Sequence, residues 1–439
     1  MDADPRPPGL AIPGMPMRKA RRQGGWYRRK SFAHFDLPLE FEVAESRVKD
    51  IGYVCSRSFW PFIGYDDKKR RFRTKDGEKQ VDTKNRPIKY CSHQDGYIFA
   101  YYAGLATDYY EKYLSKKAFE ASVIGYRAGL GSNIDMAKGV FAEIASRRKC
   151  VALCIDISSF FDNIDHAILK SNLQRVLGVT RLSRDWFAVY KAMTRYAWVK
   201  ADELADRLQF NRQSPPKPLC DADAFRKKVR GADPNYSNLV KPHSKMYGIP
   251  QGSPISATFS NIFMIDFDEA VHAYVSGYNG AYRRYSDDIV VICRPSAQRR
   301  VMRFIVRELA KLGGKLDISE EKTEISRFER STVGVRCDSP ITYLGFTYDG
   351  DCVTLRGRTL SRYYRRMTYA ARRAGTTARR EGAAKVFMRK LYRDFSHLGR
   401  SNFYSYAKRA SEILDDDAPK RQLRRHAAVL RRKTANFGR

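Results

Sequence analysis

Three aspartates stand out as candidate metal ligands because of the sequence around them. Asp156 follows the partly β-branched apolar run 151–155, so we expect its carboxylate at the end of a strand. Asp287 and Asp288 lie between two β-compatible stretches, which predicts a hairpin with the acidic pair at its tip. Carboxylates from a strand end and a neighbouring hairpin could hold two divalent cations, an arrangement that recurs in phosphoryl transfer.

A Gly- and Pro-rich loop separates the two acidic segments. Residues 248–254 read Gly-Ile-Pro-Gln-Gly-Ser-Pro and are followed by a helix-compatible stretch. Glycine lets the backbone approach a ligand closely, and Gln251 offers both a donor and an acceptor. Taken alone, a plain loop-to-helix junction explains this loop equally well, just as the preference of Asp for turns explains the pair at 287–288.

The charge of the chain points to a polyanionic partner. The 439 residues carry 82 Lys and Arg against 48 Asp and Glu, a net charge of +34. Nucleic acid is the first partner to consider, and an anionic membrane surface is the second. The apolar runs are far shorter than the ~20 residues that span a bilayer, and no secretory signal is seen, so we expect a cytoplasmic protein without membrane insertion. Cys150 and Cys154 share one face of the expected strand, where buried thiols are a better interpretation than a zinc site.

The composition changes along the chain in a way that indicates separate parts. A basic arm rich in Pro and Gly comes first, and helices are expected around 97–114 and 133–144. The polar cluster 162–165 predicts a further helix start. Residues 355–439 hold 24 Lys and Arg against 6 Asp and Glu, a net charge of +18, with aromatic residues between them. Such a helical region suits phosphate binding and base stacking, with an ordinary solvated basic face as the alternative.

In their order along the chain, these segments resemble the sequence motifs of the reverse transcriptases. The matching strings are Arg86-Pro-Ile, Gly125-Tyr-Arg127 with Gly131-Ser-Asn-Ile-Asp135, Val151 to Phe161, Gly248-Ile-Pro-Gln251-Gly-Ser-Pro-Ile-Ser, Tyr285-Ser-Asp287-Asp288, Glu321-Lys322-Thr323 and Tyr343-Leu-Gly-Phe346. The resemblance implies an α+β right-hand polymerase with a palm that contains an antiparallel sheet. The implied parts are a basic N-terminal arm at 1–45, fingers at 46–150, a palm at 151–350 with an irregular insertion at 200–245, and a helical basic thumb at 351–439.

The resemblance also implies roles for single residues. Asp156, Asp287 and Asp288 would bind two Mg²⁺ ions, with Mn²⁺ as an alternative, and Lys322 would protonate or neutralise the leaving pyrophosphate. The implied nucleotide-binding residues are Arg86, Arg127 at the triphosphate, Phe161 under the sugar and Gln251 beside the nascent base pair. A bulky ring at 161 would clash with a 2′-hydroxyl, so dNTPs are expected to be preferred. Residues 343–346 would form the primer-grip hairpin.

The implied activity is that of an RNA-directed DNA polymerase, which uses dNTPs and forms an RNA–DNA hybrid and a cDNA product. No ribonuclease H, integrase or HNH segment is visible, and the nearest string to the Val-Thr-Gly element of retron enzymes is Val353-Thr354-Leu355. The sequence is therefore most similar to stand-alone bacterial reverse transcriptases of the "unknown group" and abortive-infection type. That subgroup implies a role in antiphage defence and a structured non-coding RNA as partner.

Several alternatives stay open from the sequence alone. The same site could carry out untemplated or protein-primed DNA synthesis, or the chain could be a retron- or maturase-like RNA-binding protein, although binding alone requires none of the carboxylates. An RNA polymerase of the same fold is disfavoured by Phe161. The sequence does not give the template RNA, the priming mode, the product or the oligomeric state.

Overall fold

The computed structural model describes residues 25–75, 78–127, 129–210, 217–332, 334–383 and 386–435, with the side chains of 69–84 excepted. The chain is an α+β protein that divides into two compact units. Unit 1 comprises residues 1–127, 158–270 and 307–317, and unit 2 comprises residues 128–157, 271–306 and 318–439. Helices α10 (Ile265–Ser276) and α11 (Gln298–Ala310) each include residues of both units.

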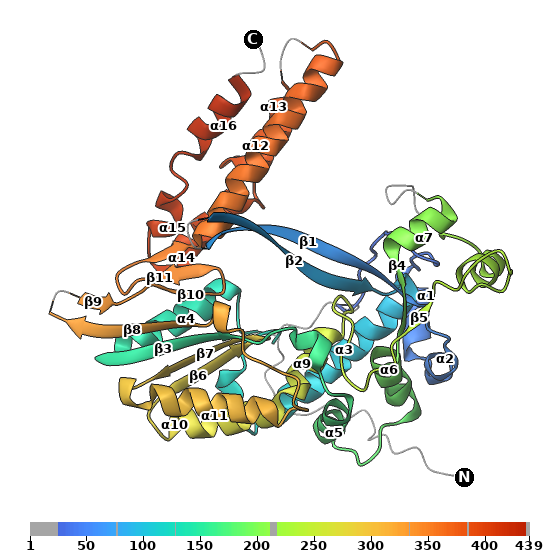
Figure 1. The fold of residues 1–439 in the computed structure, drawn as a ribbon, viewed down its shortest axis with the longest axis horizontal. Helices are drawn as coiled ribbons and strands as arrows, with labels where there is room; N and C mark the ends of the chain where they lie inside the picture. The colour runs from blue at the N-terminus through green and yellow to red at the C-terminus, as the bar shows by residue number, and fades with distance from the viewer. Residues whose placement is uncertain are drawn as a thin grey trace. The chain divides into compact units, whose positions relative to one another are not determined.

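Unit 1 contains a four-stranded sheet with the strand order β2-β1-β4-β5. β1 (Phe62–Lys75) and β2 (Glu78–Tyr90) form a long antiparallel hairpin, visible in Figure 1. β4 (Ala197–Lys200) runs parallel to β1, and β5 (Lys241–Pro242) pairs antiparallel with β4. Apolar side chains of this sheet are buried in one cluster with side chains from residues 201–239. The cluster includes Ile63, Val199 and Leu204.

Helices make up the rest of unit 1. The long helix α3 (His93–Leu114) confirms the predicted helix around 97–114, and it begins after Ser92, whose Oγ accepts a hydrogen bond from the Asp95 N–H at 3.2 Å. The other elements described there are α1 (Phe41–Lys49), α2 (Ile51–Ser56), η1 (Glu120–Ser122), η2 (Phe160–Asn163), α5 (His166–Leu177), α6 (Arg184–Thr194), α7 (Ala201–Leu208), α8 (Ala222–Ala224), η3 (Phe225–Val229) and α9 (Ser256–Phe263). The helix start predicted at 162–165 is confirmed, since the Asp165 carboxylate caps α5.

Unit 2 is built on a five-stranded antiparallel sheet with the order β6-β7-β3-β8-β9. The strands are β3 (Lys149–Asp156), β6 (Ala281–Tyr285), β7 (Asp288–Cys293), β8 (Glu324–Ser331) and β9 (Gly334–Cys337), and Figure 1 shows them side by side. β3 lies between β7 and β8, which explains why residues 150–155 are apolar and buried at every position. Cys150 and Cys154 are among these buried residues.

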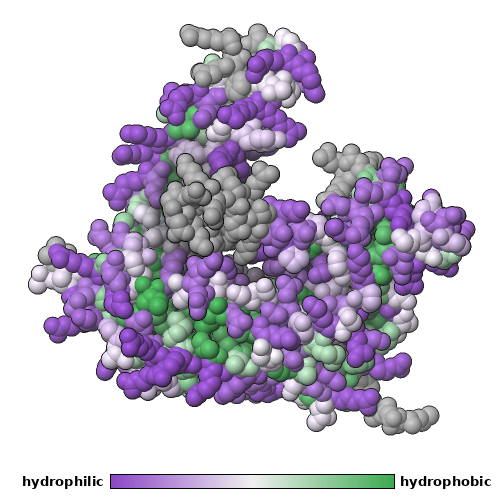
Figure 2. Space-filling view, viewed as in Figure 1, coloured by the Kyte–Doolittle hydropathy of each residue, from purple (hydrophilic) through white to green (hydrophobic). Residues whose placement is uncertain are grey.

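A second, three-stranded sheet and a helical region complete unit 2. β10 (Ile341–Tyr343), β11 (Phe346–Tyr348) and β12 (Val353–Leu355) form the sheet, and α4 (Asn133–Ser146) packs on it through Phe141, which stacks on Tyr348 at 5.1 Å. The predicted helical C-terminal region consists of α12 (Gly357–Arg380), α13 (Met388–Phe395), α14 (Phe403–Leu414), α15 (Ala418–Arg421) and α16 (His426–Ala435). Figure 2 shows that most of the visible surface of this region is hydrophilic. The short elements η4 (Pro295–Ala297) and η5 (Glu320–Lys322) also belong to unit 2.

Three expectations about the organisation of the chain concern the segment 200–245, the arm at 1–45 and the bounds of the fingers. The segment 200–245 is not irregular throughout, because Ala201 and Leu204 of α7 are buried in the sheet cluster of unit 1. Of the arm predicted at 1–45, residues 1–24 lie outside the described residues, whereas Trp26 packs edge-on against Tyr97 and α1 begins at residue 41. Unit 1 ends its first segment at residue 127 and not at 150, so the assignment of fingers, palm and thumb stays a prediction. No helix among the described residues has the length and apolar character needed to cross a membrane.

Candidate active site

The sheet of unit 2 brings the three predicted aspartates together. β3 ends at Asp156 and β7 begins at Asp288, and these two residues are direct partners in the antiparallel register. Asp288 is also paired with Tyr285 across the hairpin, so Ser286 and Asp287 form its two-residue turn. Ser286 has φ 59°, the left-handed conformation that such turns require. The predicted strand end and the predicted hairpin are both confirmed.

Backbone hydrogen bonds fix this turn against the strand end. The Ile157 N–H donates to the Asp287 carbonyl at 3.2 Å, and the Ser319 N–H donates to the Asp156 carbonyl at 2.8 Å. Beneath the turn, the guanidinium of Arg284, which is fully buried, donates to the Ser286 carbonyl at 3.1 Å. The positions of the carboxylates are therefore set by main-chain contacts on rigid elements.

The electrostatics of the cluster fit a divalent cation site. Burial and the neighbouring carboxylates of Asp287 and Asp156 raise the pKa of Asp288 to about 7, although Lys322 and Arg356 oppose the shift. The neighbouring carboxylates repel one another when all are charged, and a bound cation would relieve this repulsion. Carboxylate oxygens are the ligand type that Mg²⁺ and Mn²⁺ prefer. Among the described residues, however, no three acidic, His or Cys side chains already converge on a single point.

The raised pKa of Asp288 gives a pH prediction. A cation at this site must displace the proton that Asp288 holds below about pH 7. Apparent Mg²⁺ or Mn²⁺ affinity should therefore be highest above pH 7 and should fall by about tenfold per pH unit below it. Calorimetric titration with Mn²⁺ between pH 5.5 and 8.5 measures this slope. An affinity that stays constant from pH 8 to pH 6 would contradict the assignment.

Lys322 lies beside Asp156 and therefore belongs to the aspartate cluster. It ends the short turn η5, and its Nζ forms an ion pair with Oδ2 of Asp156. Both side chains are partly exposed, at 30% and 20%. Cation binding by Asp156 would thus compete with this ion pair, and the predicted action of Lys322 on pyrophosphate stays a prediction.

All four predicted nucleotide-binding residues belong to unit 1, and two of them lie where the Gly/Pro loop packs against the start of η2. The Ile249 N–H donates to the Phe161 carbonyl at 2.9 Å, next to Gln251. Gly248 has φ +91°, and a Cβ there would lie 2.8 Å from the Asp162 carbonyl oxygen, so only glycine allows this close approach. Both Phe161 and Gln251 are half-buried. The hydrogen bond between their two segments places them in one local arrangement.

Lys89 is a residue of this arrangement that sequence reasoning missed. Its N–H donates to the Gln251 carbonyl at 2.9 Å, and its Nζ lies over the rings of Tyr196 and Trp198, at 5.6 and 5.4 Å from their centroids. Burial lowers the pKa of its ammonium group. Its place directly after the Arg86-Pro-Ile string was the available signal. Arg86 itself is exposed on β2, opposite Asp67 in the hairpin register.

Arg127, which is predicted to contact the triphosphate, forms ion pairs and hydrogen bonds within unit 1. Its Nη2 pairs with Oε2 of Glu111 at 2.7 Å and with Oε1 of Glu120 at 3.2 Å, and its Nη1 donates to the carbonyls of Glu120 and Val123 at 2.6 and 3.2 Å. The side chain is only 3% exposed. These contacts hold residues 111–127 together, and the predicted triphosphate contact of Arg127 stays a prediction.

Replacement of Arg127 should therefore destabilise the fold. Arg127→Ala removes the nearly buried ion pair with Glu111, and breaking a buried pair costs about 3–5 kcal/mol. Chemical denaturation followed by circular dichroism measures the change in the free energy of unfolding. Arg127→Ala combined with Glu111→Gln should recover part of the loss. A stable Arg127→Ala variant whose only defect is a raised KM for dNTP would contradict this structural role and would support the predicted triphosphate contact.

Comparison with known proteins identifies a family. The family described as "Reverse transcriptase (RNA-dependent DNA polymerase)" matches residues 106–348, whereas a search of curated proteins gave no match. Among solved structures, the chain is similar to the apo telomerase of Candida tropicalis truncated from its C-terminal domain, with TM-score 0.42 and 11% identity over 66% of this chain and 55% of that chain. The apo telomerase of C. tropicalis gives TM-score 0.39 and 11% identity over 89% and 63% of the two chains. The telomerase of C. albicans in complex with a TWJ fragment of telomeric RNA gives TM-score 0.40 and 12% identity over 90% and 66%.

The chain spans less than two thirds of the length of each of these telomerases. The family match, in contrast, covers more than half of the present chain and includes Asp156, Asp287 and Asp288. The chain, with its α+β right-hand polymerase fold, belongs to the reverse transcriptase family.

Proposed function

We propose that this protein is an RNA-directed DNA polymerase that adds dNTPs to a 3′-hydroxyl. The observation that carries the proposal is the paired register of Asp156 and Asp288, with Asp287 in the adjoining turn. These three carboxylates would hold two divalent cations, which supply the positive charge that a transferring phosphoryl group requires. The chain's own contribution is to fix the carboxylates at rigid strand ends.

Selection of deoxynucleotides is assigned to Phe161. Its carbonyl accepts a hydrogen bond from the Gly/Pro loop that carries Gln251, so the backbone of η2 that carries the ring is held in place. A fixed ring under the sugar would exclude a 2′-hydroxyl by steric clash, while Gln251 would contact the nascent base pair. The hairpin of β10 and β11, whose turn contains Leu344 and Gly345 at positive φ, is proposed as the primer grip.

A structured RNA is the proposed template. Residues 355–439 carry a net charge of +18, and α12 buries Tyr363, Met367 and Ala371 on one face while Arg362, Arg365 and Arg366 lie on other faces. A basic helical surface of this kind binds phosphates and makes binding strongly salt-dependent. The sequence resemblance to stand-alone bacterial enzymes favours a cytoplasmic role in antiphage defence with a non-coding RNA partner.

Sequencing of co-purifying nucleic acid tests this function. We expect one specific folded RNA together with cDNA complementary to it, after expression of the full chain in a bacterial host. The Asp287→Ala/Asp288→Ala variant should retain the RNA and lose the cDNA. Random cellular RNA without cDNA in both preparations would contradict the proposal of a dedicated template, and cDNA in the variant would contradict the metal site.

A further inference from the structure

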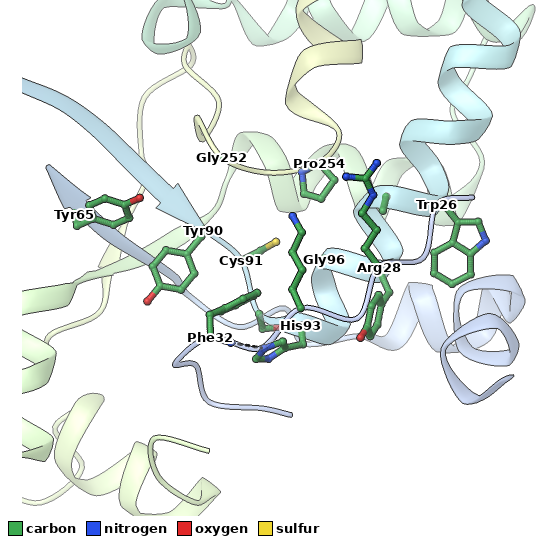
Figure 3. A pocket seen from close by; sticks show the side chains of 14 residues that line it. Trp26, Arg28, Phe32, Tyr65, Tyr90, Cys91, His93, Gly96, Gly252 and Pro254 are labelled. Carbon is green, nitrogen blue, oxygen red and sulfur yellow. Dashed lines mark hydrogen bonds between the residues drawn. The ribbon is translucent and has the colours of Figure 1, made fainter. Parts of the chain in front are cut away.

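The loop of unit 1 that carries Gln251 borders open space. Directly after Gln251, the residues Gly252 and Pro254 line a cavity of about 590 Å³ (Figure 3). A backbone segment beside a cavity lacks packing contacts on that side, so packing alone does not fix its position. The hydrogen bonds of residues 247–251 are therefore the contacts that decide where Gln251 lies.

Two histidine side chains bind the carbonyl groups at the start of this loop. Nε2 of His166 lies 2.8 Å from the Gly248 carbonyl oxygen, and Nε2 of His243 lies 2.8 Å from the Tyr247 carbonyl oxygen. Burial lowers the pKa of both imidazoles below the ordinary value of 6.5, so both rings are neutral at pH 7. Since a carbonyl oxygen only accepts, the proton of each neutral ring must lie on Nε2. Two adjacent carbonyls of the loop are thus held by imidazole donors.

His166 is anchored at the start of α5. It is the first residue of this helix, which the Asp165 carboxylate caps, and its carbonyl accepts a hydrogen bond from the Tyr190 hydroxyl at 2.8 Å. Its own N–H donates to the Met246 carbonyl at 3.1 Å. The backbone and the side chain of one buried residue therefore bind the chain on either side of Tyr247.

His243 is fixed by a different part of unit 1. It follows β5 directly, and its N–H donates to the Tyr196 carbonyl at 2.8 Å. Its ring stacks on the ring of Tyr196, with centroids 4.5 Å apart and planes at 11°. The rings of His166 and His243 lie 5.9 Å apart. The two donors therefore come from separate elements and meet at one end of the loop.

The chain that the histidines hold leads to both predicted nucleotide contacts. The Ile249 N–H, directly after the two bound carbonyls, donates to the Phe161 carbonyl at 2.9 Å, and Gln251 follows two residues later. A shift of residues 247–249 would therefore move both Gln251 and the backbone that carries Phe161. Small displacements of groups that position a substrate cost much of the rate of a reaction.

A single bond between a histidine and a carbonyl would indicate stability alone, because buried polar groups are ordinarily hydrogen-bonded. Here, two histidines from separate elements bind adjacent carbonyls. Both bonds fall immediately before the residue that contacts Phe161. This placement favours a role in the proposed nucleotide site.

We infer that His166 and His243 are positioning residues for nucleotide selection. Their Nε2–H groups hold two adjacent carbonyls of the loop. They thereby set the positions of Gln251, beside the nascent base pair, and of the backbone that carries Phe161. This role rests on the proposed function, whereas the fixing of the loop requires no catalysis. Neither histidine touches the nucleotide or transfers a proton in this account.

The test removes each donor and then restores it. His166→Leu and His243→Phe delete the donor and fill the space with an apolar side chain, and the Phe ring keeps the stack on Tyr196. Single-turnover incorporation over a range of dNTP concentrations should show an apparent Kd for dNTP that is raised at least about fivefold, with a maximum rate changed less than about threefold. His166→Gln and His243→Gln provide an amide N–H in place of Nε2–H and should stay within about twofold of the wild type.

Tyr102→Phe is the matched control for a loss of stability. It removes a buried hydrogen bond of unit 1, from the Tyr102 hydroxyl to Oδ2 of Asp185 at 2.7 Å, that joins α3 to α6. It should lower the free energy of unfolding and leave the apparent Kd for dNTP within about twofold of the wild type. An equal rise of this Kd in Tyr102→Phe, or equal effects of the apolar and the Gln variants, would overturn the inference. If His166→Leu does not fold, an unchanged Kd in His243→Phe is sufficient to overturn it.

Hydrogen exchange followed by mass spectrometry separates this inference from the proposed function, because it requires no dNTP. Peptides that contain residues 247–253 should exchange at least about fivefold faster in His166→Leu and His243→Phe than in the wild type and the Gln variants. If the wild type makes no DNA but this difference appears, the histidines fix the loop and the polymerase proposal fails. If DNA synthesis proceeds and neither the exchange nor the Kd for dNTP changes in the variants, the inference fails and the proposed function stands.

Discussion

Asp288→Asn is expected to abolish DNA synthesis while making the protein more stable. Primer extension should fall by at least about 10³-fold, because a neutral amide replaces one of the carboxylates proposed to bind the divalent cations. The folded state raises the pKa of Asp288 to about 7, above its ordinary value of 3.8, through burial and the neighbouring Asp287 and Asp156. Above pH 7 the charged Asp288 carboxylate of the wild type is therefore repelled by Asp287 and Asp156, whereas the neutral amide of the variant is not.

The sign of the stability effect follows from proton binding. Between about pH 4 and pH 7 the folded state holds a proton that the unfolded state has released, so wild-type stability should fall as the pH rises through this range. Asp288→Asn should remove that fall and stabilise the protein at pH 8 by on the order of 2 kcal/mol, since the site is only partly buried.

Thermal unfolding in buffer containing a chelator measures this difference. The midpoint of Asp288→Asn should lie a few degrees above that of the wild type at pH 8 and should match it near pH 4. Asp351→Asn is the matched control, because Asp351 is an exposed carboxylate of unit 2 outside the cluster, and it should change neither activity nor stability. An active Asp288→Asn enzyme, or one destabilised at pH 8, would contradict the account of the cluster.

Phe161→Ala is expected to admit ribonucleotides. Removal of the ring opens the space that a 2′-hydroxyl would occupy, while the Phe161 carbonyl that accepts from Ile249 remains in place. The ratio of kcat/KM for dNTP to that for NTP should fall by about 10–100-fold, the range that a steric contact can supply.

Single-nucleotide incorporation with dGTP and GTP, and with each other matched pair, measures this ratio. Phe161→Tyr keeps the ring and should leave the ratio within about twofold of the wild type. If Phe161→Ala is active on dNTPs and still rejects NTPs as strongly as the wild type, sugar selection lies with another residue.

Local signals were sufficient to predict the elements that hold the aspartates. The apolar run before Asp156 has the pattern of a buried strand, and in the structure β7 and β8 flank this strand on both sides. The hairpin around Asp287 is specified by its own residues. The cap of α5 by Asp165 was equally local. These features depend on spacings of a few residues, which sequence patterns report directly.

Contacts between residues that lie far apart in the chain could not be predicted from the sequence. Arg127 has the position of a phosphate ligand in the sequence, but its pairing with Glu111, 16 residues earlier, becomes visible only in the fold. The ion pair of Lys322 with Asp156 joins residues 166 positions apart. Helix α7 was missed because its apolar residues are few, and they are buried only once β4 supplies a surface for them.

The cluster at 156, 287 and 288 is proposed to copy RNA into DNA. The most direct measurement is extension of a labelled primer on an RNA template of defined sequence, followed by sequencing of the product. We expect DNA complementary to the template, dependent on Mg²⁺ or Mn²⁺, from the wild type, and none from Asp287→Ala/Asp288→Ala although that variant binds the same RNA. Product from the double variant, or wild-type product unrelated to the template, would contradict the claim.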